Sequence, residues 1–327
     1  MAVDLPPTCY EVMARNRWRT LLLFALFPIM LAAMTMLGSL ALAIVESDGA
    51  GGAIGPSALQ NFLAISPVVG AVGTMWIGIT LVSGKRMVLA FAGAKPIAKR
   101  DAPELYRIVE NLAIRTGITM PALYVIDDPS LNAFATGYSP NRAAVAVTKG
   151  ILEKLEKPEL EAVLAHEFGH ILSRDTRVML IAIAMVGILQ MLSEIVIRGI
   201  FHGSRGSRDR KDGGPVLLLI AIGVWLIGSV CAVLVQMGIS RKREYLADAQ
   251  SAYLTRDPLS LAAALAKISA DPRVEVLDGK RTAVALCIAD PLEEKQSFVD
   301  GMLGLFSTHP PVKDRIALLR GMGGTAA

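Results

Sequence analysis

Four long apolar runs dominate this chain and restrict the folds that it can adopt. They cover residues 21–45, 62–82, 178–197 and 216–239. Each is close to the roughly 20 residues that an α-helix needs to cross the hydrocarbon core of a bilayer. The composition agrees with this reading, because 53% of the residues are hydrophobic, only 19% are charged and the mean hydropathy is +0.49. We therefore expect a mostly α-helical membrane protein with four transmembrane or hairpin helices.

The first run has an alternative interpretation as the core of a signal peptide. Arg15, Arg17 and Arg19 precede it, as the basic region of a signal peptide would. However, the apolar stretch 21–45 is longer than the ~7–15 residues of a signal core. We therefore expect it to stay in the protein as a membrane anchor.

The distribution of Lys and Arg predicts the orientation in the membrane. The loop 46–60 contains neither residue, whereas the segments before the first run and after the second are basic. Because Lys and Arg favour the cytoplasmic side, residues 1–20, 84–176 and 240–327 are expected in the cytoplasm. The basic loop 198–215 disagrees with this rule. Either it lies outside nevertheless, or runs three and four form a hairpin that does not fully cross.

The basic balance of the chain points to the membrane and not to nucleic acid. The formal net charge is +4, but the basic residues lie beside apolar runs, as Arg241, Lys242 and Arg243 do. A nucleic-acid-binding protein would gather them on a soluble face. The three cysteines are scattered along the chain and predict neither a disulfide framework nor a thiolate metal cluster. The lipid bilayer is thus an expected partner, and nucleic acid is not.

Residues 84–176 have the character of a soluble α+β domain. Apolar residues recur at helical spacing in its first part, and short β-prone segments bounded by turn residues follow. Residues 137–141 include Gly, Ser, Pro and Asn, which favour a turn between two strands. The expected elements are a helix over 102–116 and a small antiparallel sheet with strands over 122–126, 133–136 and 143–148.

A helix that begins near Pro158 and ends near Leu172 carries the strongest chemical signal. It contains the sequence His166-Glu167-Phe168-Gly169-His170. Residues four apart share one face of a helix, so both imidazoles can reach one zinc ion. Glu167 borders the same face, where it can take a proton from a water molecule at the metal. This spacing predicts a catalytic metal site with Glu167 as its base.

A third protein ligand is needed, because catalytic zinc usually has three protein ligands and one water. His202 lies in the loop beyond the third run, on the far side of the membrane if that run spans. Glu244 lies just past the fourth run, and a hairpin of runs three and four would return it beside His170. Asp248, one turn further, could accept the remaining N–H of a ligand histidine.

His309 is the remaining histidine, in the sequence Ser307-Thr308-His309-Pro310-Pro311. From its residues alone two roles stay open. It could be a surface residue that precedes a helix over 313–319, or it could be a donor that stabilises the developing oxyanion.

These motifs, in this order, resemble the HtpX-type heat-shock membrane metalloproteases, which are relatives of the CAAX prenyl proteases. The resemblance covers about residues 20–320. The matching stretches are 83–85, 102–106, 126–130, 132–137, 166–170, 241–249 and 307–315.

The resemblance implies a zincin-like cytoplasmic protease domain that holds one Zn²⁺ per subunit. Its expected activity is that of a zinc endopeptidase which hydrolyses membrane and misfolded proteins. It further implies that Glu244 is the third ligand and that His309 assists the transition state. By the same analogy, Asn132, Ala133, Phe134 and Ala135 form an edge strand that holds a protein or peptide substrate in extended form. Ordinary sheet packing is the alternative role of that strand.

Two other functions remain open at this point. A catalytically silent membrane scaffold would use zinc only structurally, with four protein ligands. A dedicated prenyl-peptide processing protease would need a larger intramembrane chamber and more spans than four. The chain also departs from the family at residues 1–16, which precede the first span, and in the Gly-rich loop 49–55. Neither departure lies within the site motifs.

Overall fold

The computed structural model describes most of the chain and divides it into two compact units. The described residues are 9–46, 54–203, 216–224, 226–227, 241–270 and 310–323. One unit, here called the helical unit, comprises Arg19–Leu81 and Ile181–Val235. The other, here called the sheet unit, comprises Met1–Trp18, Val82–Leu180 and Gln236–Ala327. Each unit is described by itself below.

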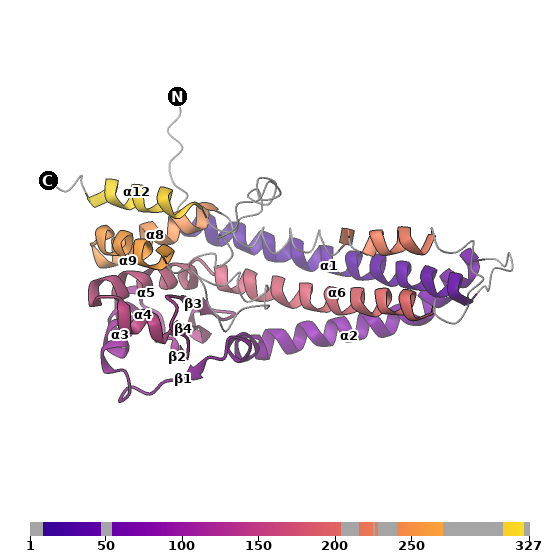
Figure 1. Cartoon of the computed structure of the whole chain (residues 1–327), viewed down its shortest axis with the longest axis horizontal. Coiled ribbons are helices and arrows are strands. Elements are labelled where there is room, and N and C mark those ends of the chain that lie inside the picture. Colours follow the sequence, from indigo (N-terminus) through magenta and orange to yellow (C-terminus); the bar gives the residue numbers. More distant parts are fainter. Residues whose placement is uncertain are drawn as a thin grey trace, which may run out of the picture. The chain divides into compact units, whose positions relative to one another are not determined.

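The helical unit is built from helices that are long and apolar enough to cross a membrane. Figure 1 shows them as extended rods, and the candidate spans within α1, α2 and α6 are Phe24–Glu46, Ile54–Phe91 and Asp175–Gly199. Large apolar side chains on α2 are exposed, among them Leu63 at 61% and Val68 at 63%. An apolar surface of this extent would be unfavourable in water. It is suited to contact with lipid tails.

The observed helices extend beyond the expected apolar runs. Polar residues at the ends continue the helical hydrogen bonding that the apolar runs begin, so hydropathy alone underestimates each length. The expected fourth span, 216–239, lies only partly within the described residues, which are helical over 216–224. The bounds are Cys9–Glu46 for α1, Ile54–Phe91 for α2 and Asp175–Gly203 for α6.

The sheet unit contains a four-stranded mixed sheet in the order β1-β2-β4-β3. β3 and β4 pair antiparallel, as expected, with Phe134 opposite Ala146. β2 and β4 are parallel, with Tyr124 opposite Ala146, so the expectation of a purely antiparallel sheet is wrong. β1 is a short strand that the sequence did not indicate. The strand bounds are Lys95–Pro96 for β1, Ala122–Ile126 for β2, Ala133–Thr136 for β3 and Ala144–Thr148 for β4.

A hydrogen-bond network at Thr148 explains why β2 and β4 are parallel. The Thr148 hydroxyl donates to the Ser130 carbonyl at 2.6 Å and accepts from the Asn132 N–H at 3.0 Å. The Thr148 N–H in turn donates to the Asn132 carbonyl at 2.9 Å. These bonds fasten the segment after β2 across the end of β4, so that β3 forms on the far side of β4. The chain then returns by a hairpin, which leaves β4 between β2 and β3.

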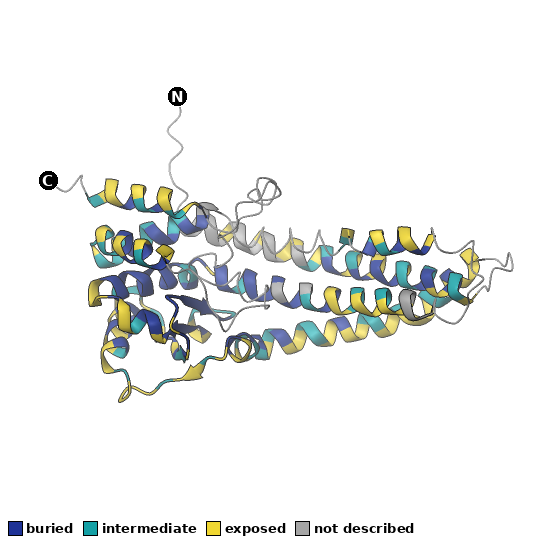
Figure 2. Ribbon diagram, in the orientation of Figure 1, coloured by how far each residue is buried: buried dark blue, intermediate teal, exposed yellow. Residues whose placement is uncertain are grey.

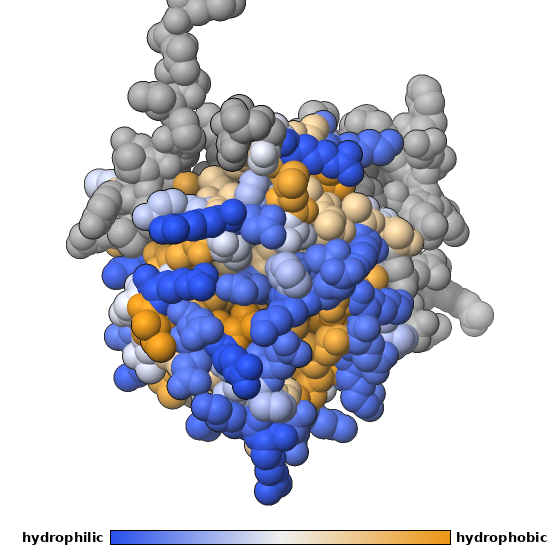
Figure 3. Space-filling model, turned by 90° about the vertical axis from the view of Figure 1, so that its left-hand side faces the viewer, coloured by the Kyte–Doolittle hydropathy of each residue, from blue (hydrophilic) through white to orange (hydrophobic). Residues whose placement is uncertain are grey.

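Helix α5, Lys157–Leu172, is the central helix of the sheet unit. Most of its apolar residues are buried, including Leu164 and Phe168 at 0% exposure, and Figure 2 shows it mostly in the colour of buried residues. The unit's outer surface, turned to the viewer in Figure 3, is mostly hydrophilic. The other helices here are α3 (Pro103–Thr116), α4 (Lys149–Lys154), α8 (Arg241–Thr255), α9 (Pro258–Ala270) and α12 (Val312–Gly323).

Candidate metal centre

Local sequence fixes where α5 begins. Glu156 is its N-cap, and the Glu159 carboxylate accepts from the Glu156 N–H at 2.8 Å, which is one half of a capping box. Glu159 also pairs with Lys267 of α9 at 2.7 Å. Pro158 stands at the second helical position, where a missing N–H costs nothing. The helix therefore starts one residue before the expected position and brings both histidines to its buried side.

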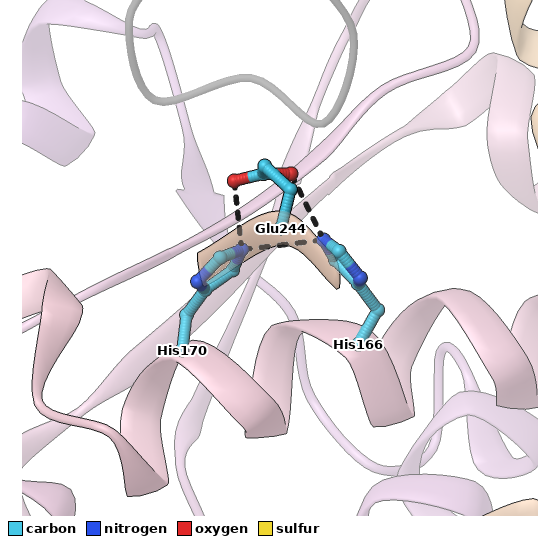
Figure 4. A group of neighbouring side chains, drawn as sticks. All are labelled: His166, His170 and Glu244. Atoms are coloured by element: carbon cyan, nitrogen blue, oxygen red, sulfur yellow. Dashed lines mark hydrogen bonds and ion pairs between the residues drawn. The ribbon is translucent and has the colours of Figure 1, made fainter. Parts of the chain in front are cut away.

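The two histidines of α5 and Glu244 of α8 converge on one point. Figure 4 shows both imidazoles directed at the Glu244 carboxylate. The Nε2 atoms of His166 and His170 lie 3.2 Å apart. The Glu244 oxygens lie 3.6 Å from His166 Nε2 and 3.5 Å from His170 Nε2. Ligands that bond one metal at 2.0–2.1 Å in a tetrahedral arrangement are separated by about 3.3 Å. The three side chains therefore fit a single divalent ion.

Glu167 lies beside this cluster and is 3% exposed. Its carboxylate accepts a hydrogen bond from the Ala135 N–H of β3. Burial raises the pKa of Glu167 and outweighs the nearby histidines, which lower it. A carboxyl group with a raised pKa is suited to take up and return a proton near neutral pH. The arrangement thus places a base next to the cluster and against β3.

His166 is held from its outer side by Asp248 and Arg315. Its Nδ1 lies 2.9 Å from Asp248 Oδ1. Arg315 donates to both Asp248 oxygens, at 2.8 and 2.7 Å. Burial opposes the ionised form of Asp248, but Arg315 outweighs it and lowers the pKa of that carboxyl. Asp248 thus stays an anion beside the outer side of the His166 ring.

His170 has a comparable partner in Asp175, at 3.2 Å from its Nδ1. Burial would lower the pKa of His170, but the carboxylates of Glu244 and Asp175 outweigh it and raise the pKa to about 9. The pKa of His166 is raised as well, because Asp248 and Glu244 outweigh the effect of burial. The carboxylates of the pocket therefore stabilise positive charge at the two histidines.

The charges around the cluster indicate a divalent cation. Among the described residues, four buried carboxyl groups face two buried guanidinium groups, which leaves an excess of two negative charges when all four are ionised and both imidazoles are neutral. Such an excess is costly away from water unless a cation offsets it. Without a metal, protonation of His166 and His170, whose pKa values are raised, supplies positive charge. An ion of charge +2 bound by the neutral imidazoles and Glu244 would supply that charge instead. The six groups are Glu167, Asp175, Glu244, Asp248, Arg243 and Arg315.

Gly169 allows α8 to approach α5 closely enough for Glu244 to reach the histidines. A Cβ at this position would lie 3.0 Å from the Ala247 Cα and 2.8 Å from the Gln250 side-chain oxygen. A larger residue would therefore push α8 away. Gly169 thus lies at the contact between two helices.

The structure adds three residues that the sequence analysis missed. Arg315 lies in α12, Arg243 lies in α8 and Asp175 is the first residue of α6. An acidic residue five positions after the second histidine of the motif was a usable signal for Asp175. No spacing rule connects Arg315 to Asp248, because they are far apart in the chain. His309 lies outside the described residues, and Asn132 lies just before β3.

The sequence of this chain is similar to a known family of peptidases. The model of peptidase family M48 matches residues 99–323. The chain belongs to peptidase family M48. Members of this family are metal-dependent peptidases, and the matched segment contains the whole His166–His170–Glu244 cluster.

Curated proteases are similar in sequence to most of this M48 chain. A protease HtpX homolog of Bacteroides fragilis is 39% identical over 311 residues, covering 94% of this chain and 96% of the relative. One from Listeria monocytogenes is 40% identical over 282 residues, covering 83% and 91%. The crystal structure of S. mikatae Ste24p gives a TM-score of 0.47 at 18% identity, covering 79% of this chain and 58% of that one.

The family and the apolar helices together establish the general function. The protein is a membrane metalloprotease that resembles the HtpX proteases. A catalytically silent scaffold and a dedicated prenyl-peptide protease are not favoured by these similarities. The expected fold class is confirmed except for the strand directions given above.

Proposed function

We propose that this protease is a zinc endopeptidase whose single Zn²⁺ is bound by His166, His170 and Glu244. The observation that carries the proposal is the convergence of three ligand atoms within 4.8 Å of one another in a buried, negatively charged pocket. Mixed imidazole and carboxylate ligands suit zinc, although cobalt and manganese accept them too. When bound, the ion would polarise the scissile carbonyl and lower the pKa of a water molecule.

The residues around the ion divide the remaining work. Glu167 takes the proton from the attacking water and later gives a proton to the leaving amine. Asp248 and Arg315 keep the His166 ring in one orientation. His309 assists as a donor to the oxyanion, a role that rests on the family resemblance alone.

The first prediction concerns metal content and activity. Purified protein should contain about one zinc ion per chain and should digest casein, and a chelator should abolish digestion until zinc is restored. Elemental analysis and a casein assay measure both quantities. Protein that retains zinc but never cleaves any substrate would support the silent scaffold instead. Full activity without metal would contradict the proposed function.

We propose further that β3 binds the substrate in extended form, because its outer edge offers hydrogen-bond acceptors. The Ala133 N–H is already bonded to the Asn132 side chain at 2.8 Å, and the Ala135 N–H is bonded to Glu167. Because the carbonyl of Asn132 faces β4, those of Ala133 and Ala135 face away from it. An extended substrate can donate two N–H groups to these oxygens.

The second prediction tests this acceptor edge with N-methylated peptides. Two substrate residues, separated by one residue, should each donate one N–H to β3. Methylation of either N–H removes that hydrogen bond and should lower kcat/KM by tenfold or more. Methylation of the residue between them should have a much smaller effect. A peptide series with one methyl group moved along the chain measures this. Equal sensitivity at neighbouring positions would rule out strand-like binding.

The substrates that we propose are misfolded and membrane proteins, which the enzyme removes as part of quality control during stress. Recognition through backbone groups supports this, because it depends little on side-chain identity. Cleavage confined to prenylated peptides, with unfolded proteins left intact, would instead favour a dedicated processing protease.

The third prediction concerns location. We propose that the protein crosses the bacterial inner membrane several times and that its active site faces the cytoplasm, as the Lys and Arg distribution indicates. A cysteine introduced at Ser47, between α1 and α2 in the sequence, should react with a membrane-impermeant thiol reagent in intact cells. A cysteine at Thr325 should react only after lysis. The reverse pattern would place the active site outside.

A further inference from the structure

The two histidines of α5 need outer partners for the same chemical reason. A histidine that binds metal through Nε2 must carry its proton on Nδ1, and an acceptor at Nδ1 fixes both the proton and the ring. Asp248 meets this need for His166. Asp175 Oδ2 lies 3.2 Å from His170 Nδ1, on the side of the ring away from Glu244.

Asp175 is itself held in place by Arg243. The Arg243 Nη1 atom lies 3.0 Å from Asp175 Oδ1, so one oxygen of the carboxylate faces the guanidinium and the other faces His170. Both side chains are buried, at 5% and 9% exposure. A carboxylate fixed at both oxygens in a buried setting has little freedom to rotate. Arg243 also directly precedes Glu244, so neighbouring residues of α8 reach the cluster and its outer partner.

The turn that leads to Asp175 shows backbone strain. Arg174 has a φ of 58°, in the left-handed region that costs a non-glycine residue about 1 kcal/mol or more. This turn ends α5 and starts α6 within three residues of Leu172. It brings Asp175 back beside His170, only five residues further along the chain. The strained turn therefore places the Asp175 carboxylate within reach of His170.

We propose that Asp175 is a positioning residue for the metal site, held by Arg243, which fixes the His170 ring for binding through Nε2. The proposal rests on the proposed function, since it needs a metal at the cluster. Asp175 would do for His170 what Asp248 does for His166, but it reaches the site from α6 and not from α8. The rival role is that of an ion pair which only joins α6 to α8.

Metal affinity separates the two roles. In the full-length protein, Asp175→Asn should weaken zinc binding 10- to 100-fold, the usual effect of losing an outer partner. Competition with a chromophoric chelator, well below the unfolding temperature, measures this without reference to activity. In the zinc-saturated enzyme, KM for a peptide should be unchanged. Asp127→Asn is the matched control, because Asp127 forms an exposed pair with Lys149 in the same unit.

Different results would contradict the positioning role of Asp175 and the zinc endopeptidase function. Zinc affinity of folded Asp175→Asn within twofold of wild type would overturn the positioning role. If this variant does not fold, Asp175→Glu decides, because it keeps a charge for Arg243 but displaces the contact to His170. A tenfold loss of affinity in Asp175→Glu supports the role, and an unchanged affinity overturns it. Wild-type protein that binds no metal would refute the proposed function instead.

Discussion

Replacing Glu167 by glutamine should lower kcat for peptide hydrolysis by about 10²- to 10⁴-fold while zinc content stays at the wild-type level. The amide has nearly the same shape as the carboxyl group and can still contact the Ala135 backbone. It cannot accept a proton from water near neutral pH. Because Glu167 is not one of the three converging ligands, the metal site should remain intact.

Casein digestion and elemental analysis of the same sample check this prediction. Glu161→Gln is the matched control, since it makes the same change on the same helix at a half-buried residue that pairs with Arg115. The control should keep activity within about twofold. If Glu167→Gln cleaved casein at the wild-type rate, Glu167 would not be the base.

Replacing Arg315 by methionine should have the largest effect on stability. Arg315 is fully buried and bonded to both oxygens of Asp248. Methionine fills much of the space but leaves the Asp248 carboxylate buried without that cation. Breaking a buried ion pair in this way costs about 3–5 kcal/mol. For a unit of this size, we expect the unfolding midpoint to fall by roughly 10 °C.

Thermal unfolding of the purified protein, followed by circular dichroism, measures the shift. Lys99→Met is the control, because its pair with Glu110 is exposed and should contribute less than about 1 kcal/mol. The double variant Arg315→Met/Asp248→Asn should recover part of the loss, since it removes both charges. A midpoint for Arg315→Met equal to that of Lys99→Met would show that the buried pair does not stabilise the unit.

Local patterns predicted much of the fold, because they depend on short-range physics. The apolar spacing of Leu105, Ile108 and Leu112 predicted the buried face of α3. Hydropathy predicted α1, α2 and α6, although their polar ends were missed. The parallel pairing of β2 and β4 could not be predicted, because it depends on how Thr148 binds Ser130 and Asn132, and strand direction has no signature in the strands themselves.

The site divides in the same way. Helical spacing brings His166 and His170 together, and this follows from sequence alone. The approach of Glu244 was inferred from a hairpin of two apolar runs, of which the second is only partly described. Arg315 contacts Asp248 because α12 packs beside α8, and Arg243 contacts Asp175 across two helices. Such contacts between distant segments require the folded structure.

The most direct test is the X-ray absorption spectrum of the zinc-loaded protein and of its Glu244→Ala variant. The ligand set predicts scattering from two imidazole rings and from oxygen at about 2.0–2.1 Å in the wild type, with no sulfur. The variant should keep both imidazole signals but lose one oxygen ligand or bind zinc far more weakly. An identical spectrum and affinity in the variant would show that Glu244 does not bind the ion that the two histidines hold.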